Sequence, residues 1–366
     1  MSVEFIGFIG NNPQSETTPR TGPLLDVTHI ETLSKAHENA GFDRALLAFH
    51  STLPDCLQVG QHVASVTERL NVFIAQRPGF TAPTLFARQF ATLDHLTRGR
   101  ISLNVITGGD SNELAQDGNT IDDKDERYAR TKEFLDVVRA EWTSEKPFDY
   151  NGKYYQVKRG FSQLKPYQKN GIPVFIAGAS DAAIEVAGHH ADVFALWGET
   201  YEEVRNVLAK VKAACAKTGR AVPRFSLSFR PILADTEEKA WAKAHATLER
   251  AKAVQNQTGY AKKPGGPMNE GSKRLLALAA KGERLDKRLW TGMAALTDAR
   301  GNSTSLVGTP DQVAESLAEY YDLGIDIFLI RGFDPLIDCI EYGRDLIPRT
   351  KTLIAERSKA RGVAAE

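Results

Sequence analysis

Eight short apolar segments alternate with amphipathic helical patterns along most of the 366 residues, and this alternation restricts the fold more than any other feature. The segments are almost continuously apolar, which is typical of strands buried on both faces. Strands that alternate with helices favour a parallel sheet, and eight of them predict an α/β fold of the (β/α)8 TIM barrel type rather than an open sheet. The predicted strands are centred near residues 5, 46, 73, 103, 175, 194, 229 and 328.

We expect residues 1–350 to form a single barrel domain with two insertions. An Asn-Gly pair between aromatic residues predicts a hairpin over residues 148–157. Residues 256–305 are rich in glycine and small polar residues; a mobile lid is one interpretation and a flexible surface loop is the other. Residues 351–366 are predicted to form a polar, frayed C-terminal tail.

Charge balance and cysteine content exclude several classes of protein. The chain has 46 basic and 46 acidic side chains, which argues against nucleic acid or an anionic membrane as the main partner. Its three cysteines form no disulfide framework, and no HxH, HExxH or clustered carboxylate motif indicates a metal site. No apolar run approaches the roughly 18 residues of a membrane span, and the N-terminus lacks the features of a signal peptide. We therefore expect a cytoplasmic protein without a bound metal.

Ligands bind at the carboxyl ends of the strands in parallel barrels, so polar residues at those ends are candidate site residues. Asn104 lies in the fourth predicted strand, where a core strand would prefer Val or Ile, and a glycine-rich loop over residues 107–110 follows it. The turn of Gly178, Ala179 and Ser180 precedes a helix. Ser180 serves there either as a phosphate anchor or only as a helix N-cap.

Three arginines are candidates for binding anions. Arg127 opens a long helix and suits bidentate phosphate recognition, with pairing to Asp123 or Glu126 as the structural alternative. Arg230 and Arg331 stand on segments that should otherwise be buried, and a buried arginine needs a partner. Two such cations at strand ends suit an anionic substrate.

Three other side chains each have a functional and a structural interpretation. His50 ends the second strand and is either a site residue or a hydrogen-bonded rim histidine. Cys56 begins a helix, where a thiolate would be favoured, with a plain buried thiol as the alternative. Trp197 follows the sixth strand and suits either stacking on a ring or covering the barrel mouth.

Four separated motifs carry a family resemblance: NVITGGD at 104–110, DERY at 125–128, IAGASD at 176–181 and ALWGE at 195–199. In this order and spacing they resemble the flavin-dependent alkanesulfonate monooxygenases, which belong to the bacterial luciferase-like (β/α)8 barrels. The Gly-Asn-Asn of residues 10–12 also looks like the start of the related pyrimidine monooxygenases. The resemblance spans essentially the whole chain.

The resemblance implies a two-component reaction. A separate NAD(P)H:FMN reductase supplies reduced FMN, which reacts with O2 to give a C4a-(hydro)peroxyflavin; a sulfonate substrate then loses sulfite and leaves an aldehyde. It places the phosphate at Ser180 with its turn, Gly178 and Ala179, and at Arg127 and Tyr128. It also implies a non-prolyl cis peptide at Ala75-Gln76. The FMN contacts implied by motif position are Phe49, His50, Asn104, Glu113, Arg127, Tyr128 and Ser180.

The substrate side matches the family pattern less closely. Cys56, Trp197 and Arg300 fall at positions of active-site residues in the alkanesulfonate monooxygenases. Arg230 stands where those enzymes have a histidine, Ser228 replaces an arginine, and Phe333 replaces a catalytic tyrosine near Arg331. These departures remove two proton carriers, which leaves His50 or the flavin peroxide to serve, or indicates a different substrate.

We therefore expect a reduced-FMN-dependent monooxygenase for a small organosulfur compound, in first place an alkanesulfonate. One alternative is a related enzyme for sulfones, other heteroatom compounds or a ring amide, or a deazaflavin oxidoreductase on the same fold. The other is a flavin-binding relative without turnover. A homodimer or homotetramer is expected by analogy with relatives.

Overall fold

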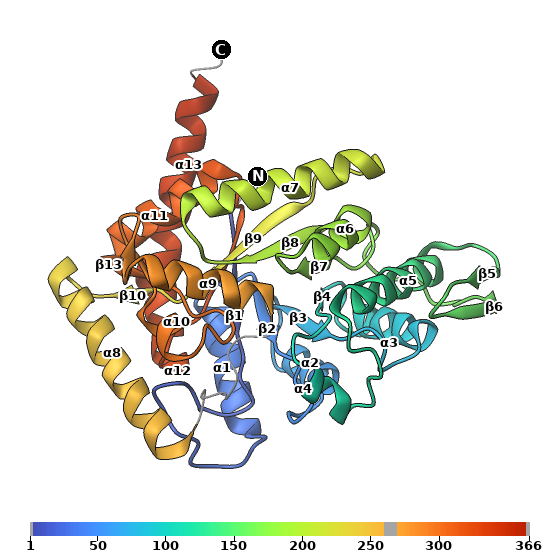
Figure 1. The fold of residues 1–366 in the computed structure, drawn as a ribbon, viewed down its shortest axis with the longest axis horizontal. Helices are drawn as coiled ribbons and strands as arrows, with labels where there is room; N and C mark the ends of the chain where they lie inside the picture. The colour runs from blue at the N-terminus through green and yellow to red at the C-terminus, as the bar shows by residue number, and fades with distance from the viewer. Residues whose placement is uncertain (1–2, 260–268, 364–366) are drawn as a thin grey trace. The chain divides into compact units, whose positions relative to one another are not determined.

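The computed structural model describes residues 3–259 and 269–363 and contains a closed barrel of eight parallel strands (Figure 1). The strands close in the order β1-β14-β9-β8-β7-β4-β3-β2. Each lies where an apolar segment predicted it, so the prediction of a (β/α)8 barrel is confirmed. The barrel strands are β1 (Glu4–Phe8), β2 (Arg44–Leu47), β3 (Asn71–Gln76), β4 (Ile101–Val105), β7 (Val174–Ala177), β8 (Val193–Trp197), β9 (Arg224–Phe229) and β14 (Ile327–Ile330).

Helices connect or flank the strands, and most begin at a side chain that accepts a hydrogen bond from the first turn, such as Asp26, Asp55 and Asp110. The longer helices are α1 (Val27–Asn39), α2 (Cys56–Ser65), α3 (Pro83–Leu96), α5 (Lys124–Thr143), α6 (Asp181–His190), α7 (Tyr201–Thr218), α8 (Glu237–Thr258), α9 (Glu270–Lys281), α11 (Pro310–Leu323) and α13 (Ile347–Val363). The shorter ones are α4 (Ser111–Gln116), α10 (Gly292–Leu296), α12 (Pro335–Glu341) and the π-helical turn η1 (Tyr342–Leu346). No helix of the described chain combines the length and apolar character needed to cross a membrane.

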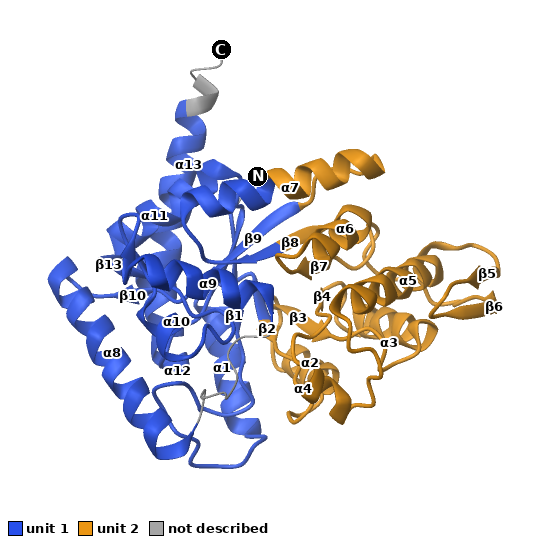
Figure 2. Ribbon diagram, in the orientation of Figure 1, with its two compact units in different colours: residues 1–45, 195–208, 224–366 blue, residues 46–194, 209–223 orange. Residues whose placement is uncertain are grey.

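The chain divides into two compact units (Figure 2). Unit 1 comprises Met1–Ala45, Ala195–Leu208 and Arg224–Glu366, and unit 2 comprises Leu46–Phe194 and Ala209–Pro223. All residues predicted to contact FMN lie in unit 2, together with Cys56. Trp197, Arg230, Arg300, Arg331 and Phe333 lie in unit 1.

An antiparallel hairpin of β5 (Phe148–Asn151) and β6 (Gln156–Gly160) stands at the insertion expected over residues 148–157. The Glu133 carboxylate of α5 holds it, because it accepts hydrogen bonds from the backbone N–H groups of Lys153, Tyr154 and Tyr155 at 2.8, 2.8 and 3.2 Å. A charged acceptor with three N–H donors makes strong hydrogen bonds, so the hairpin is fixed to unit 2.

The described residues between α8 and β13 (Ser305–Gly308) are folded. The helices α9 and α10 share a buried apolar cluster that includes Leu275, Leu278 and Ala294. The short strands β10 (Ile232–Leu233), β11 (Arg284–Leu285) and β12 (Leu289–Trp290) join β13 in a four-stranded sheet of order β10-β13-β12-β11. Residues 260–268 of the expected lid lie outside the described residues, and mobility of residues 256–305 stays a prediction.

Residues 351–363, which were expected to belong to a frayed tail, instead continue α13. Ile354 is buried, Lys351 donates a hydrogen bond to Asp43 at 3.4 Å, and Arg357 pairs with Asp322 at 2.9 Å. The helix persists because one of its faces is buried, a stabilisation that the polar composition of this segment conceals.

A buried histidine joins β1 to α1. The ring of His37 lies against Gly7, where a Cβ atom would fall 1.9 Å from Cδ2 of the imidazole, so only glycine fits at this strand position. His37 Nδ1 donates to the Leu33 carbonyl at 2.8 Å, and Nε2 accepts from the Phe8 backbone N–H at 3.3 Å. Only the neutral imidazole makes both bonds. Burial, against the opposing effect of the Leu33 hydrogen bond, lowers the pKa of His37 to about 4.

We expect the free energy of unfolding to decrease between pH 6.5 and pH 4, because the unfolded chain then binds a proton on His37 that the folded chain does not. The contribution is present above pH 6.5, is lost as the pH falls through this window, and amounts to roughly 2–3 kcal/mol. Urea unfolding of the wild type and of His37→Gln at several pH values tests this. The variant should be less stable at pH 7 and should lack this part of the pH dependence, whereas His245→Gln, at an exposed site, should match the wild type at pH 7. Equal pH slopes in wild type and His37→Gln would contradict the assignment.

Candidate functional site

The predicted site residues occupy strand ends and the helix starts that follow them. Cys56 begins α2, Glu113 lies in α4, and Arg127 and Tyr128 lie in the first turns of α5. At or just after the strand ends stand Phe49 and His50 (β2), Ala75 and Gln76 (β3), Asn104 (β4), Gly178, Ala179 and Ser180 (β7), Trp197 (β8), Arg230 (β9) and Arg331 (β14).

Glu113 is the centre of an ion-pair network in unit 2. Its carboxylate pairs with Arg77 at 2.8 Å and accepts from the Ser51 backbone N–H at 3.0 Å. His50 Nε2 lies 3.5 Å from Glu113 Oε1, while His50 Nδ1 contacts the Thr52 hydroxyl at 2.9 Å. Glu113 thus positions His50 and the loop after β2.

Arg77 belongs to this network, although the resemblance did not assign it to the site. Its side chain is buried, and its guanidinium carbon lies 4.9 Å from the centroid of the Phe49 ring. Arg77 Nε is buried and has no hydrogen-bond partner among the described residues. The available signal was its place directly after β3, since a buried arginine at a strand end requires a carboxylate.

Hydroxyl groups gather at the start of α6 in unit 2. Ser180 caps the helix, accepting from the Ala183 backbone N–H at 3.3 Å. Burial raises the pKa of Tyr128 against the opposing interactions of its hydroxyl with the Thr107 and Ser180 side chains, so the phenol stays neutral. A Cβ atom at Gly178 would fall 2.6 Å from that hydroxyl, so glycine provides the space for this hydroxyl cluster of Thr107, Tyr128 and Ser180.

Arg127 pairs with neither Asp123 nor Glu126 through its side chain. Its guanidinium instead donates to the backbone carbonyls of Ile121 at 3.1 Å and Asp122 at 2.6 Å. It reaches Gly108 at 3.4 Å, while its Nε, also buried, has no partner among the described residues. Arg127 therefore shapes the chain between β4 and α5, and a contact with phosphate stays a prediction.

Asn104 brings an unpaired acceptor into β4. Its Oδ1 is buried and has no hydrogen-bond partner within the described ranges. Asn104 is in register with Ala75 of β3 and Phe175 of β7, which fixes its place in the sheet. An unpaired amide oxygen in a barrel strand is the kind of group that a ligand N–H or O–H satisfies.

The expectation of a cis peptide at Ala75-Gln76 is wrong, because the described chain contains no cis peptide bond. Both residues continue the regular ladder, with Ala75 opposite Asn104 and Gln76 opposite Val105. The Gln76 carbonyl also accepts from the Ile106 N–H at 3.0 Å. Regular parallel pairing on this edge is satisfied by trans peptides.

Cys56 is a buried thiol in the structure. Its Sγ donates to the Ala75 carbonyl at 2.9 Å, and Gln76 Nε2 lies 3.5 Å from the sulfur. Burial, reinforced by the nearby Asp55 charge, raises the pKa of Cys56 to about 12. The thiolate favoured by a helix N-terminus does not form at neutral pH, so Cys56 acts here as a hydrogen-bond donor.

Arg230 has a carboxylate partner that the sequence did not identify. The residue is only 1% exposed, and its guanidinium pairs with Glu16 at 2.8 Å and donates to the Gly332 carbonyl at 2.9 Å. Arg331 lies 3.5 Å from the same carboxylate. Burial alone would raise the pKa of Glu16, but the two arginines outweigh it and lower the pKa to about 2.

Phe333 packs into the apolar core of unit 1, and its ring centroid lies 3.7 Å from the Arg230 guanidinium. The aromatic face stabilises the cation that it covers. Arg331 is similarly placed over the Phe8 ring at 5.0 Å. Phe333 therefore supports Arg230, and its side chain offers no group that carries a proton.

Trp197 contacts the insertion helix α9, since a Cβ atom at Gly271 would fall 2.9 Å from its ring. Close by in sequence, Glu199 forms a two-pronged ion pair with Arg274 of α9. The pair fixes α9 to the loop after β8, within unit 1. Arg300 is exposed, and its predicted contact with substrate stays a prediction.

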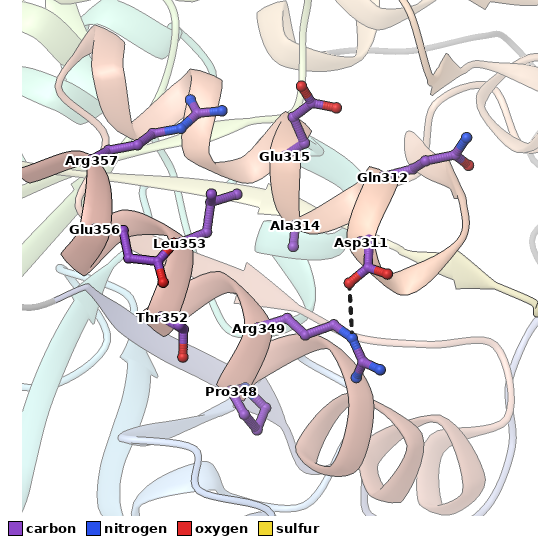
Figure 3. A pocket seen from close by; sticks show the side chains of 10 residues that line it. All are labelled: Asp311, Gln312, Ala314, Glu315, Pro348, Arg349, Thr352, Leu353, Glu356 and Arg357. Carbon is purple, nitrogen blue, oxygen red and sulfur yellow. Dashed lines mark hydrogen bonds and ion pairs between the residues drawn. The ribbon is translucent and has the colours of Figure 1, made fainter. Parts of the chain in front are cut away.

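Two cavities lie on helix surfaces. One, of about 600 Å3, lies between α11 and α13 in unit 1, and two of its lining residues, Arg349 and Asp311, form an ion pair at 3.0 Å (Figure 3). The other, of about 480 Å3, lies along α2 and α3 in unit 2 and has Gln76 in its wall. The first contains no predicted site residue, and the second contains only Gln76.

The donors and acceptors of unit 2 fit FMN. The hydroxyl cluster at the N-terminus of α6 offers neutral donors to a phosphate, and Asn104 Oδ1 offers an acceptor to a flavin N–H or ribityl O–H. No group of three His, Cys, Asp or Glu side chains in the described ranges is arranged to hold a metal ion.

Comparisons with known proteins agree with this geometry. Residues 3–326 match the family model described as luciferase-like monooxygenase. A riboflavin lyase, solved with modified FMN and riboflavin, superposes with a TM-score of 0.78 at 20% identity, covering 98% of this chain and 92% of that one. EDTA monooxygenase from Chelativorans sp. BNC1 superposes with a TM-score of 0.76 at 20% identity, covering 96% of this chain and 94% of that one. A long-chain alkane monooxygenase superposes with a TM-score of 0.75 at 19% identity, covering 96% of this chain and 92% of that one. At these identities the structural likenesses establish the fold.

We expect Glu16→Gln to lower the free energy of unfolding at pH 7 by roughly 3–5 kcal/mol, because it leaves the buried Arg230 without a counter-charge. The lowered pKa of Glu16 means that its contribution is present above pH 4.5 and is lost as the pH falls towards 2. Urea unfolding at pH 7 and at pH 3 measures both effects. The difference in the free energy of unfolding between wild type and variant should be smaller at pH 3 than at pH 7. Glu126→Gln, at a surface ion pair, is the control and should leave stability unchanged. A stable Glu16→Gln variant at pH 7 would show that Arg230 does not depend on this partner.

Proposed function

Because the chain belongs to the luciferase-like monooxygenase family, we propose that it uses reduced FMN and O2 to oxygenate a small organosulfur compound, with an alkanesulfonate as the expected substrate. Such a reaction releases sulfite and leaves an aldehyde. A separate NAD(P)H:FMN reductase supplies the reduced flavin. Location in the cytoplasm and assembly into a homodimer or homotetramer stay predictions.

The observation that carries the proposal is the hydroxyl cluster of Thr107, Tyr128 and Ser180 beside Gly178. Three neutral hydroxyl groups at the positive end of α6 suit a phosphate, since they donate hydrogen bonds where the helix dipole favours an anion. Within this hydroxyl cluster Tyr128 is the most suitable residue for mutation, because it is buried and remains protonated.

Other residues of unit 2 bind the flavin or hold a proton near the hydroxyl cluster. Asn104 binds the flavin through its unpaired Oδ1, and the Glu113 network holds the Phe49–His50 segment in place. Bound reduced FMN supplies the electrons that activate O2. His50, which contacts Glu113 and Thr52, is the residue that we propose for holding a proton during the reaction.

A second candidate substrate is a neutral organosulfur compound such as a sulfone. The observation that favours it is Glu16, whose carboxylate lies with Arg230 and Arg331 and reduces the positive charge that a sulfonate would meet. The two candidates differ in charge but share oxygen atoms on sulfur.

The purified chain should consume reduced FMN and O2 with product formation when it is combined with an FMN reductase, NAD(P)H and a substrate. Ethanesulfonate and dimethyl sulfone are tested side by side, and the readouts are sulfite release and the oxygenated product. Product from either compound supports the proposal and identifies the class. If FMN binds but neither compound nor a wider set of heteroatom substrates is oxygenated, the chain is a flavin-binding relative without turnover.

Tyr128→Phe should weaken the binding of reduced FMN about tenfold, because it removes one hydrogen bond to the phosphate. Anaerobic fluorescence titration measures the dissociation constant. Tyr154→Phe is the matched control, since the Tyr154 hydroxyl is bonded to Glu126 on the hairpin side of α5. Unchanged affinity in Tyr128→Phe, or an equal loss in both variants, would remove the hydroxyl cluster from the flavin site.

A further inference from the structure

Ser228 and Arg230 share one face at the end of β9. The intervening Phe229 packs against Tyr320 of α11, with ring centroids 5.0 Å apart, so its neighbours point to the opposite face of the strand. Ser228 is in register with Leu329 of β14, and the Arg331 N–H donates to the Phe229 carbonyl at 3.3 Å. The two side chains therefore stand where β9 and β14 end together in unit 1.

Residues 302–304, at the end of the insertion, are tied to the same strand ends. The Arg230 N–H donates to the Thr304 carbonyl at 2.9 Å, and the Asn302 carbonyl lies 3.5 Å from an Arg331 guanidinium nitrogen. The Thr304 hydroxyl also donates to the Gly198 carbonyl at 2.7 Å. Asn302 is thereby held beside Arg230 and Arg331.

Apart from Arg230 Nη1, which is ion-paired with Glu16, four polar atoms of this cluster are buried without a hydrogen-bond partner in the described part of the chain: Ser228 Oγ, Arg230 Nε, Asn302 Nδ2 and Asn302 Oδ1. The three side chains are 5%, 1% and 8% exposed, so bulk water does not satisfy them. Leaving such atoms unpaired is costly, and native proteins tolerate it where a ligand completes the bonding.

The partners of Arg230 occupy only part of its guanidinium. Glu16 and the Gly332 carbonyl engage the terminal nitrogens, while Nε keeps its N–H unpaired. Together with the Ser228 hydroxyl and the Asn302 amide, it forms a set of donors that suits a head group rich in acceptor oxygens.

We propose that Ser228, Arg230 and Asn302 form a head-group subsite that binds the oxygen atoms on the sulfur of the substrate. The subsite rests on the proposed function, and it names Ser228 and Asn302 as residues that determine specificity. Sulfonates and sulfones present the same sulfur-bound oxygens, so both compounds bind through these donors. A sulfonate carries a negative charge and a sulfone is neutral, and the binding test below uses this difference to distinguish the two substrate classes.

The test measures binding without turnover. Ethanesulfonate and dimethyl sulfone are titrated into the chain by calorimetry, anaerobically, with and without reduced FMN. We expect Ser228→Ala and Asn302→Ala each to weaken binding of the preferred compound about tenfold while reduced FMN binds as in the wild type. The nearly isosteric Asn302→Asp should abolish binding of the sulfonate through charge repulsion and weaken that of the sulfone only moderately.

Ser226→Ala and Ser303→Ala are the matched controls. Ser226 is buried on the same face of β9 as Ser228, and Ser303 is next to Asn302 but donates to the Gly301 carbonyl at 3.4 Å. Both should bind as the wild type does, and circular dichroism with thermal unfolding verifies that every variant is folded.

Three outcomes would overturn the subsite. Unchanged binding in Ser228→Ala and Asn302→Ala would mean that water alone satisfies these atoms. Equal losses in the variants and their controls would mean a general loss of packing. Wild-type chain that binds neither compound, but turns over other substrates with reduced FMN, would reject the subsite and keep the proposed function. Conversely, binding that follows the expected pattern without turnover would keep the subsite and reject the monooxygenase.

Discussion

The barrel strands are buried on both faces, so a charged side chain at their ends is stable only when a counter-charge is buried with it. Two carboxylates meet this requirement. In unit 2, Glu113 pairs with Arg77 and holds the loop that carries His50. In unit 1, Glu16 pairs with Arg230 and lies near Arg331. Neither carboxylate belongs to a barrel strand. Glu113 lies in the short helix α4 and Glu16 in a segment without helix or strand, and each carboxylate links its segment to a strand end.

Both networks leave buried hydrogen-bonding groups without a partner among the described residues. In unit 2 the Asn104 Oδ1 and Arg77 Nε atoms stay unpaired, and in unit 1 the same holds for atoms of Ser228, Arg230 and Asn302, counting partners only among the described residues. In unit 1 the two arginines share one carboxylate, so one positive charge stays uncompensated beside the unpaired donors and acceptors, and a polar ligand would satisfy these atoms. These unpaired atoms support our proposals of a flavin site in unit 2 and of a site for sulfur-bound oxygen atoms in unit 1.

Local sequence patterns predicted those structural features that depend only on residues close together in the chain. The eight strands and the Ser180 turn follow from apolar runs and short-range turn chemistry. The partner of Arg230 did not follow, because Glu16 lies 214 residues away in a segment without helix or strand. The expected cis peptide at Ala75-Gln76 came from motif position alone, and the described chain holds a trans peptide there, within the ladder with β4.

The sequence by itself determined the closed α/β barrel and the order of its strands along the chain, since hydrophobic periodicity is a local property that the printed residues contain. It also determined which residue types stand at the strand ends. The tertiary structure alone decided which of them are already paired: Arg230 with Glu16, Arg77 with Glu113, and Cys56 with the Ala75 carbonyl. Pairing depends on distances between segments far apart in sequence, and those distances exist only once the barrel has closed.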